Sequence, residues 1–180
     1  MSDDEQTPAD DADNADVARP EAELRYHAVV TDSLGDVVLH PTAAGYLETM
    51  TAARDDGFDQ LIDLTAVDYL AFSAPRGLPT GIDPERFEVV AQLINHGSGE
   101  RLRVRVQVPG DEAVVSSLFD LWPGSEALER EAFDMFGIEF ADHPDMSRIL
   151  MPEEWVGHPL RKDYAVGAIP VQFKAASNIR

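Results

Sequence analysis

Two strand patterns joined by a short turn are the feature that most restricts what this sequence can fold into. Residues 101–108 alternate strictly between polar and apolar side chains, and residues 87–94 alternate more loosely. Between them, residues 95–99 contain the Asn and Gly typical of a hairpin turn. The pattern predicts an antiparallel hairpin with one packed face. The polar face carries Arg101, Arg103 and Arg105, which is consistent either with a solvent-facing sheet surface or with a basic strip for a partner.

The segments around the hairpin predict further strands and helices. Extended pieces are expected at 26–30 and 37–39, and a buried strand at 58–69 with Ile62, Leu64 and Ala66 on one face. A short extended piece is also expected at 148–151. Capping residues and helical spacing predict helices at 42–55, 112–121 and 126–136, the last ending at Gly137. The resulting fold class is α+β: a single domain with a mixed, largely antiparallel sheet and helices on one face.

Charge divides the chain into three parts. Residues 1–23 carry nine acidic side chains and Arg19 as their one basic residue, so they are expected to form a disordered acidic tail. Residues 24–164 form the expected domain. Residues 165–180 contain no acidic residue and keep several apolar ones, which favours an extended arm bound to a partner protein.

Composition excludes several function classes. The chain has no cysteine, so it offers neither thiolate ligands for an iron–sulfur cluster nor a cysteine nucleophile. Its net charge of −20 argues against nucleic-acid binding, which requires Lys and Arg to neutralise phosphates. No stretch is apolar enough to span a membrane.

One local cluster resembles a catalytic site. It supplies imidazole and carboxylate groups that could bind a metal ion, and its members are Asp142, His143, Asp145, His158 and Asp163. The spacing matches no known ligand motif, and both histidines precede proline. A stand-alone metal-dependent hydrolase therefore remains a remote alternative, and structural histidines are the preferred interpretation.

Two long motifs identify a family. The first is EREAFDMFGI at 129–138, followed by His143, Pro144 and Arg148, and the second is WVGHPLRKDY at 155–164. In this order they resemble the signatures of the thirty-kilodalton subunit of respiratory complex I, which in bacteria is the C-type subunit of NADH-quinone oxidoreductase. Ser147 departs from the signature, which usually has Lys, Arg or Pro there. The positions that the resemblance marks as structural or interface residues are Glu129, Arg130, Glu131, Asp134, Gly137, His143, Pro144, Arg148, Trp155, Gly157, His158, Pro159, Arg161, Lys162, Asp163 and Tyr164.

The resemblance implies a non-catalytic scaffold subunit of the peripheral arm, on the cytoplasmic side of the inner membrane. Such a subunit braces the quinone-reducing module of a proton-translocating NADH-quinone oxidoreductase within a hetero-oligomer. Its expected partners are the forty-nine-kilodalton (D-type) subunit and neighbouring iron–sulfur subunits. FMN, iron–sulfur clusters and quinone are expected on those partners, and this chain is expected to hold no catalytic, cofactor or metal site. The equivalent subunit of a ferredoxin- or F420-dependent quinone reductase, or of a membrane-bound hydrogenase, is the alternative.

The charged residues of the first motif suggest a structural role. Glu129, Arg130, Glu131 and Asp134 lie on one short predicted helix and can pair with Arg148, Arg161 or Lys162, fixing the C-terminal loops. A solvated helix face is the competing interpretation.

Overall fold

The computed structural model describes residues 23–165, which contain a six-stranded sheet, a two-stranded sheet and two α-helices. The predicted acidic tail (1–23) and extended arm (165–180) therefore lie outside the described residues, except for Glu23 and Ala165. In chain order the elements are β1 (Leu24–Arg25), β2 (Ala28–Ser33), β3 (Asp36–His40), α1 (Tyr46–Asp55), β4 (Gln60–Asp68), β5 (Phe87–Ile94), β6 (Arg101–Val108), β7 (Val114–Ser116), a 3₁₀ turn (Pro123–Ser125), α2 (Glu126–Phe136) and β8 (Glu139–Ala141).

The larger sheet has the strand order β1-β2-β3-β6-β5-β4. The β3–β6 pair is parallel and the other pairs are antiparallel, so the sheet is mixed and largely antiparallel as expected. The β5–β6 hairpin is confirmed, with Phe87 opposite Val108 and Ile94 opposite Arg101. In its turn, Oδ1 of Asn95 accepts hydrogen bonds from the N–H groups of Gly97 and Ser98.

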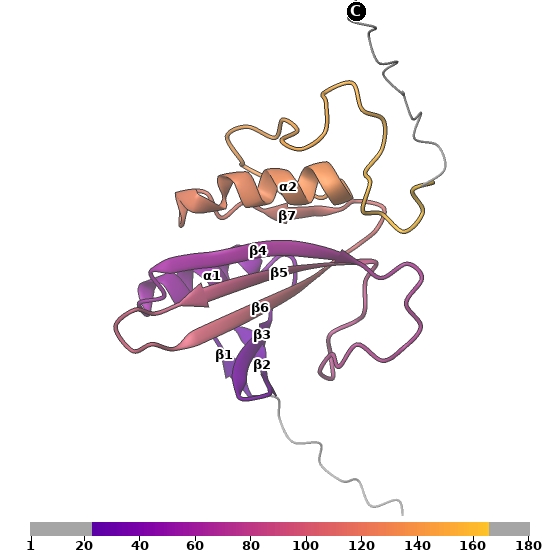
Figure 1. Ribbon diagram of the computed structural model, residues 1–180. Coiled ribbons are helices and arrows are strands. Elements are labelled where there is room, and N and C mark those ends of the chain that lie inside the picture. The colour runs from indigo at the N-terminus through magenta and orange to yellow at the C-terminus, as the bar shows by residue number, and fades with distance from the viewer. Residues whose placement is uncertain (1–22, 166–180) are drawn as a thin grey trace, which may run out of the picture.

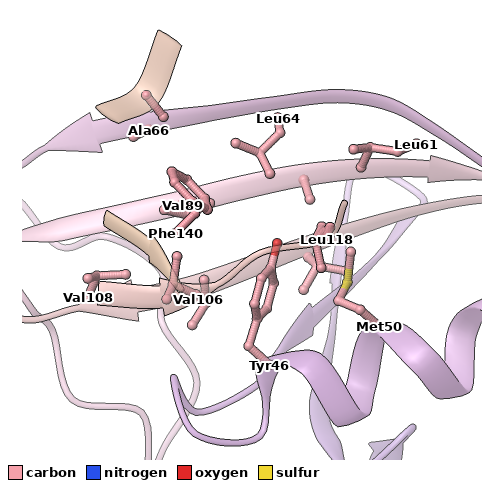
Figure 2. Packing of buried hydrophobic residues seen from close by; sticks show 14 of the residues in the cluster. Tyr46, Met50, Leu61, Leu64, Ala66, Val89, Val106, Val108, Leu118 and Phe140 are labelled. Carbon is pink, nitrogen blue, oxygen red and sulfur yellow. The ribbon is translucent and has the colours of Figure 1, made fainter. Parts of the chain in front are cut away.

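One face of this sheet holds the core. Its inward side chains pack against α1, α2 and the β7–β8 pair in one continuous apolar cluster. Figure 2 shows Tyr46 and Met50 of α1 reaching toward Leu64 and Val106 of the sheet. Both helices lie on the same side of the sheet, with α2 above β4 in Figure 1. The chain after α2 crosses back over this helix as an irregular loop (Figure 1).

The expected helix at 112–121 is wrong. Residues 114–116 instead form β7, which pairs in parallel with β8 and places Val115 opposite Phe140. Two β-branched valines and two serines in succession have low helix propensity. Both Val115 and Phe140 are buried, so strand pairing adds apolar burial to a segment with little tendency to form a helix.

The expected inward face of β4 is wrong at one position. A β-bulge between Leu61 and Asp63 shifts the register against β5. Leu61, Leu64 and Ala66 are therefore buried, whereas Ile62 is 44% exposed. Because one extra residue reverses the alternation of side chains, a period of two cannot hold across the bulge.

Helix boundaries agree closely with expectation at one helix and less well at the other. Helix α2 spans residues 126–136 as predicted, and Gly137 ends it with φ of +70°. Helix α1 begins only at Tyr46, because Thr42 forms a separate turn in which its carbonyl and its Oγ1 both accept the N–H of Gly45.

Candidate functional site

The charged residues of α2 divide between buried and exposed positions. The side chains of Glu129 and Asp134 are fully buried, Arg130 is half-buried, and Glu131 is exposed. Buried carboxylates require partners, and those partners come from the segments before and after the helix. The helix and the loop at 143–164 that it holds form the candidate functional site, and this loop is here called the anchored loop.

Asp134 fixes the middle of the anchored loop. Its Oδ2 accepts the backbone N–H groups of Ile149, Leu150 and Met151 at 3.1, 2.8 and 2.8 Å, and its Oδ1 accepts Nη1 of Arg148 at 2.5 Å. Burial raises the pKa of this carboxyl, but these donors lower it more, and the net pKa lies below the usual value. The expected extended piece at 148–151 is not a strand, because its N–H groups bind this carboxylate rather than another chain segment.

Arg130 holds the start of the same segment. Its Nε and Nη2 donate to the carbonyl and hydroxyl oxygens of Ser147 at 3.1 and 2.9 Å, and Nη2 also donates to the carbonyl of Arg148 at 3.2 Å. Its Nη1 pairs with Glu126, four residues earlier on the helix, at 2.9 Å. Ser147, where the sequence departs from the family signature, thus supplies an acceptor for Arg130.

Glu129 connects α2 to the segment before it. Its two oxygens accept the hydroxyl of Ser117 at 2.6 Å and the N–H of Leu118 at 2.7 Å. Burial raises the pKa of Glu129, and these two donors offset the shift only in part. Nε2 of His143 lies 3.9 Å from the carboxylate and donates to the carbonyl of Glu126 at 3.2 Å.

The C-terminal end of α2 is capped by side chains of the second motif. His158 donates from Nδ1 to the carbonyl of Asp134 at 3.0 Å, and Arg161 donates to the carbonyls of Phe136 and Gly137 at 2.5 and 3.3 Å. Carbonyls at a helix C-terminus lack intrahelical partners and carry partial negative charge, so these donors suit that position. Burial lowers the pKa of His158, which favours its neutral form.

An ion-pair cluster ties the end of the anchored loop to the large sheet. Arg86 pairs with the buried carboxylate of Asp68 at 3.0 Å and with the exposed carboxylate of Asp163 at 2.8 Å. The backbone N–H of Lys162 also donates to Asp68 at 2.9 Å. Burial raises the pKa of Asp68, but Arg86 and the backbone donors outweigh it and the net pKa is lowered. The loop is therefore fixed at its beginning, middle and end.

The remaining motif residues shape the turn between these anchors. Gly157 has φ of +89°, and a Cβ there would lie 2.9 Å from the ring of Tyr164. Its carbonyl accepts Nη2 of Arg148 at 3.0 Å. Trp155 is half-buried, and the side chain of Lys162 is exposed. Pro144 is exposed and Pro159 is half-buried, and both follow the histidines that the structure uses as hydrogen-bonding groups.

The structure therefore brings together part of the predicted cluster. The prediction left open which helix charge pairs with Arg148, Arg161 or Lys162. In the structure Asp134 pairs with Arg148, and Arg161 donates to a carbonyl at the helix terminus instead of to a carboxylate. The side chain of Glu131 is exposed and has no hydrogen bond or ion pair within residues 23–165. Asp68 and Arg86 were not singled out as site residues; Asp68 ends β4 and Arg86 directly precedes β5, so their link to the anchored loop follows only from the fold.

The side chains that could bind a metal ion do not lie close together in the described part of the chain. Among residues 23–165, no three His, Asp or Glu side chains are placed to hold a metal ion. His143 and His158 bond to carbonyls at different positions of α2 and pack against different rings, those of Phe119 and Phe133. The alternative of a metal-dependent hydrolase gains no support from this geometry.

The anchored loop displays apolar side chains to solvent. The exposed fractions are 59% for Leu150, 87% for Val156 and 48% for Leu160, and Ile149 is also exposed. A loop fixed by buried charges that keeps apolar groups outside is suited to contact with another protein. None of the helices in residues 23–165 is long and apolar enough to cross a membrane.

The fold and the site define a class of protein by its architecture: an α+β domain in which buried carboxylates of one helix fix an extended loop. Comparison with known sequences gives the family. The chain belongs to the family described as respiratory-chain NADH dehydrogenase, 30 Kd subunit, whose model matches residues 39–169.

Individual relatives agree with this assignment. NADH-quinone oxidoreductase subunit 5 of Thermus thermophilus is 38% identical over 159 residues, covering 86% of this chain and 73% of the relative. The C-type NADH-quinone oxidoreductase subunit of Ralstonia nicotianae is 44% identical over 141 residues, covering 76% of this chain and 68% of the relative.

Solved structures show the same fold. The trypsin-resistant fragment (1-134) of Nqo5 superposes with a TM-score of 0.59 at 35% identity, covering 66% of this chain and 89% of the fragment. A chain of the membrane-bound sulfane sulfur reductase, an archaeal respiratory membrane complex, superposes with a TM-score of 0.63 at 23% identity, covering 85% of this chain and 90% of that one. The second likeness concerns the fold alone.

Proposed function

We propose that this chain is a scaffold subunit of an NADH-quinone oxidoreductase, and that its anchored loop is a docking surface for other subunits. Relatives that are 38% and 44% identical carry that enzyme's subunit names. The observation that carries the docking role is the loop itself, with its backbone bound by Asp134, Arg130 and Asp68 and its apolar side chains exposed.

In this proposal the chain contributes architecture, and electron transfer belongs to its partners. It packs on the forty-nine-kilodalton (D-type) subunit and neighbouring iron–sulfur subunits in the peripheral arm, on the cytoplasmic side of the inner membrane. FMN, iron–sulfur clusters and quinone are held by those partners, and the assembled enzyme couples electron transfer from NADH to quinone with proton translocation. The absence of cysteine supports this division, because thiolates are the usual ligands of iron–sulfur clusters.

The proposal is tested by affinity capture of the tagged full-length chain from native membranes in mild detergent. The captured chains are identified, and NADH-to-quinone activity is measured on the eluate. Leu150→Glu together with Leu160→Glu places two charges on the loop surface, and we expect it to reduce capture of the partners strongly while the chain stays folded. Leu34→Glu is the matched control, because Leu34 is fully exposed in the β2–β3 turn, far from the loop in the fold.

Each outcome distinguishes one part of the proposal. Partners captured by the double variant at wild-type levels would exclude the loop as the docking surface. Partners captured without NADH activity, from membranes in which that activity is otherwise retained, would favour the related quinone reductases or hydrogenases. A chain that elutes alone from active membranes would overturn the subunit assignment.

A further inference from the structure

The sheet face opposite the helices carries a groove of about 860 Å³. Its floor is formed by β5 and β6, and its walls by the end of β2 and by the loop at 76–79. The lining residues are Thr31, Asp32, Ser33, Val38, Val67, Tyr69, Arg76, Gly77, Leu78, Pro79, Glu88, Val90, Gln92, Arg103 and Arg105. No helix of residues 23–165 covers this face, because α1 and α2 both pack on the other one.

Three guanidinium groups line the groove, and one of them is already held in an ion pair. Arg105 pairs with the buried carboxylate of Glu88 through two hydrogen bonds of 3.0 Å. Arg103 reaches only the half-exposed Asp36, at 3.4 Å. Arg76 lies 4.2 Å from the ring centre of Tyr69 and uses only Nη1 in hydrogen bonds within residues 23–165. Arg76 and Arg103 therefore keep N–H donors available for an anionic ligand.

This concentration of basic groups is unusual for the chain. Residues 23–165 contain eleven Lys and Arg residues in all, and the whole chain has a net charge of −20. Three of those eleven line this groove, where the acidic residues are the paired Glu88 and the exposed Asp32. The groove is thus suited to an extended acidic peptide rather than to a basic or purely apolar one.

The chain carries such a peptide immediately before β1. Residues 1–22 contain eight acidic side chains against Arg19. Glu23 directly follows this segment, and its backbone carbonyl accepts the N–H of Val30 at 2.9 Å. This bond continues the β1–β2 pairing, in which Leu24 lies opposite Val29. Followed from Arg25 back to Glu23, the backbone runs beside β2 in the direction of Thr31, which lines the groove.

We propose that the acidic segment 1–22 docks in this groove and covers the open face of the sheet. An extended chain of that length reaches up to roughly 70 Å, far more than the few strand spacings of about 4.8 Å that it must cross. Tethering makes the contact intramolecular, with an effective concentration on the order of millimolar, so that modest charge pairing suffices. The proposal goes beyond the subunit function and does not depend on it.

Paramagnetic broadening tests this in the full-length chain. Because the sequence has no cysteine, Ala9→Cys supplies one attachment point for a nitroxide label. At low ionic strength we expect loss of amide signal intensity at Val90, Gln92 and Arg103 and none at Val156 on the opposite side, relative to the reduced label. At about 1 M salt, where the Debye length is about 3 Å, the loss should disappear.

Variants locate the contact. Arg103→Glu should abolish the broadening, and Arg101→Glu, on the same strand face but outside the groove lining, should retain it. Replacing Asp10, Asp11, Asp13 and Asp16 by Asn should also abolish it without altering the domain. Docking in the groove would be overturned if no broadening is seen, or if the broadening centres on another surface. It would also be overturned if Arg101→Glu removes the broadening as completely as Arg103→Glu does. Broadening of unlabelled ¹⁵N chains by labelled chains in a mixed sample would overturn the intramolecular contact.

Discussion

Replacing Asp134 by Asn should release the middle of the anchored loop while leaving the sheet folded. The variant amide keeps one oxygen for the N–H groups of Ile149, Leu150 and Met151, but its NH₂ group would face Nη1 of Arg148, which is also a donor. A hydrogen bond to a charged acceptor stabilises by about 1 kcal/mol more than one to a neutral acceptor. Neutralising the acceptor of three such bonds should therefore reduce the stability of the loop by about 3 kcal/mol. That value agrees with the ~3–5 kcal/mol cost of breaking a buried ion pair.

Hydrogen exchange of the three amides measures this loss locally. Since about 1.4 kcal/mol corresponds to a tenfold change, their exchange should accelerate about 100-fold or more, whereas amides of β5 and β6 should change little. Glu131→Gln is the control, because Glu131 lies on the same helix and is exposed. Exchange of Ile149, Leu150 and Met151 at the wild-type rate in Asp134→Asn would refute the idea that this carboxylate holds the loop.

Three further outcomes are expected. Because the pKa of Asp134 is lowered in the folded chain, its stabilisation is complete above the usual aspartate pKa of about 4 and is lost as the pH falls through the lower folded value. Protection of the loop amides, taken as the exchange rate of an unfolded chain at the same pH divided by their own rate, should fall in that range in the wild type, and constant protection would contradict this. Gly137→Ala should lower the free energy of unfolding by at least about 1–2 kcal/mol in urea titrations, since φ is +70° and the new Cβ would lie 2.6 Å from side-chain atoms of His158 and Arg161. Leu61→Ala should cost about 2–3 kcal/mol and Ile62→Ala less than about 0.5 kcal/mol by thermal unfolding, and equal costs would argue against the bulge.

Local sequence patterns correctly predicted the elements whose backbone hydrogen bonds are made within the element or with its direct neighbour in sequence. Helix α2 and the β5–β6 hairpin follow directly from spacing, capping and turn residues. The family resemblance rests on the same helix and on the loop after it, and their role as a site stays a prediction. The sequence also placed Asp134 and Arg148 among the charges that could pair, but the choice of this pair came from the structure.

Tertiary structure decided the features that depend on distant partners. The segment at 114–116 is a strand because β8 offers it a parallel neighbour, and Ile62 is exposed because a bulge reverses its alternation. Likewise, the acids of α2 look alike in sequence, but Glu129 is buried and Glu131 is exposed.

Local sequence patterns therefore predicted the α+β class, the main hairpin and the signature helix, and the resemblance of two motifs predicted the family. The fold alone decided that Asp68 meets the N–H of Lys162, ninety-four positions away, and that the groove gathers arginines from a strand and a distant loop. The physical reason is that the periodicity of apolar residues in the sequence predicts only on which face of its own helix or strand a side chain lies. Which buried donors and acceptors then meet depends on how those faces pack together.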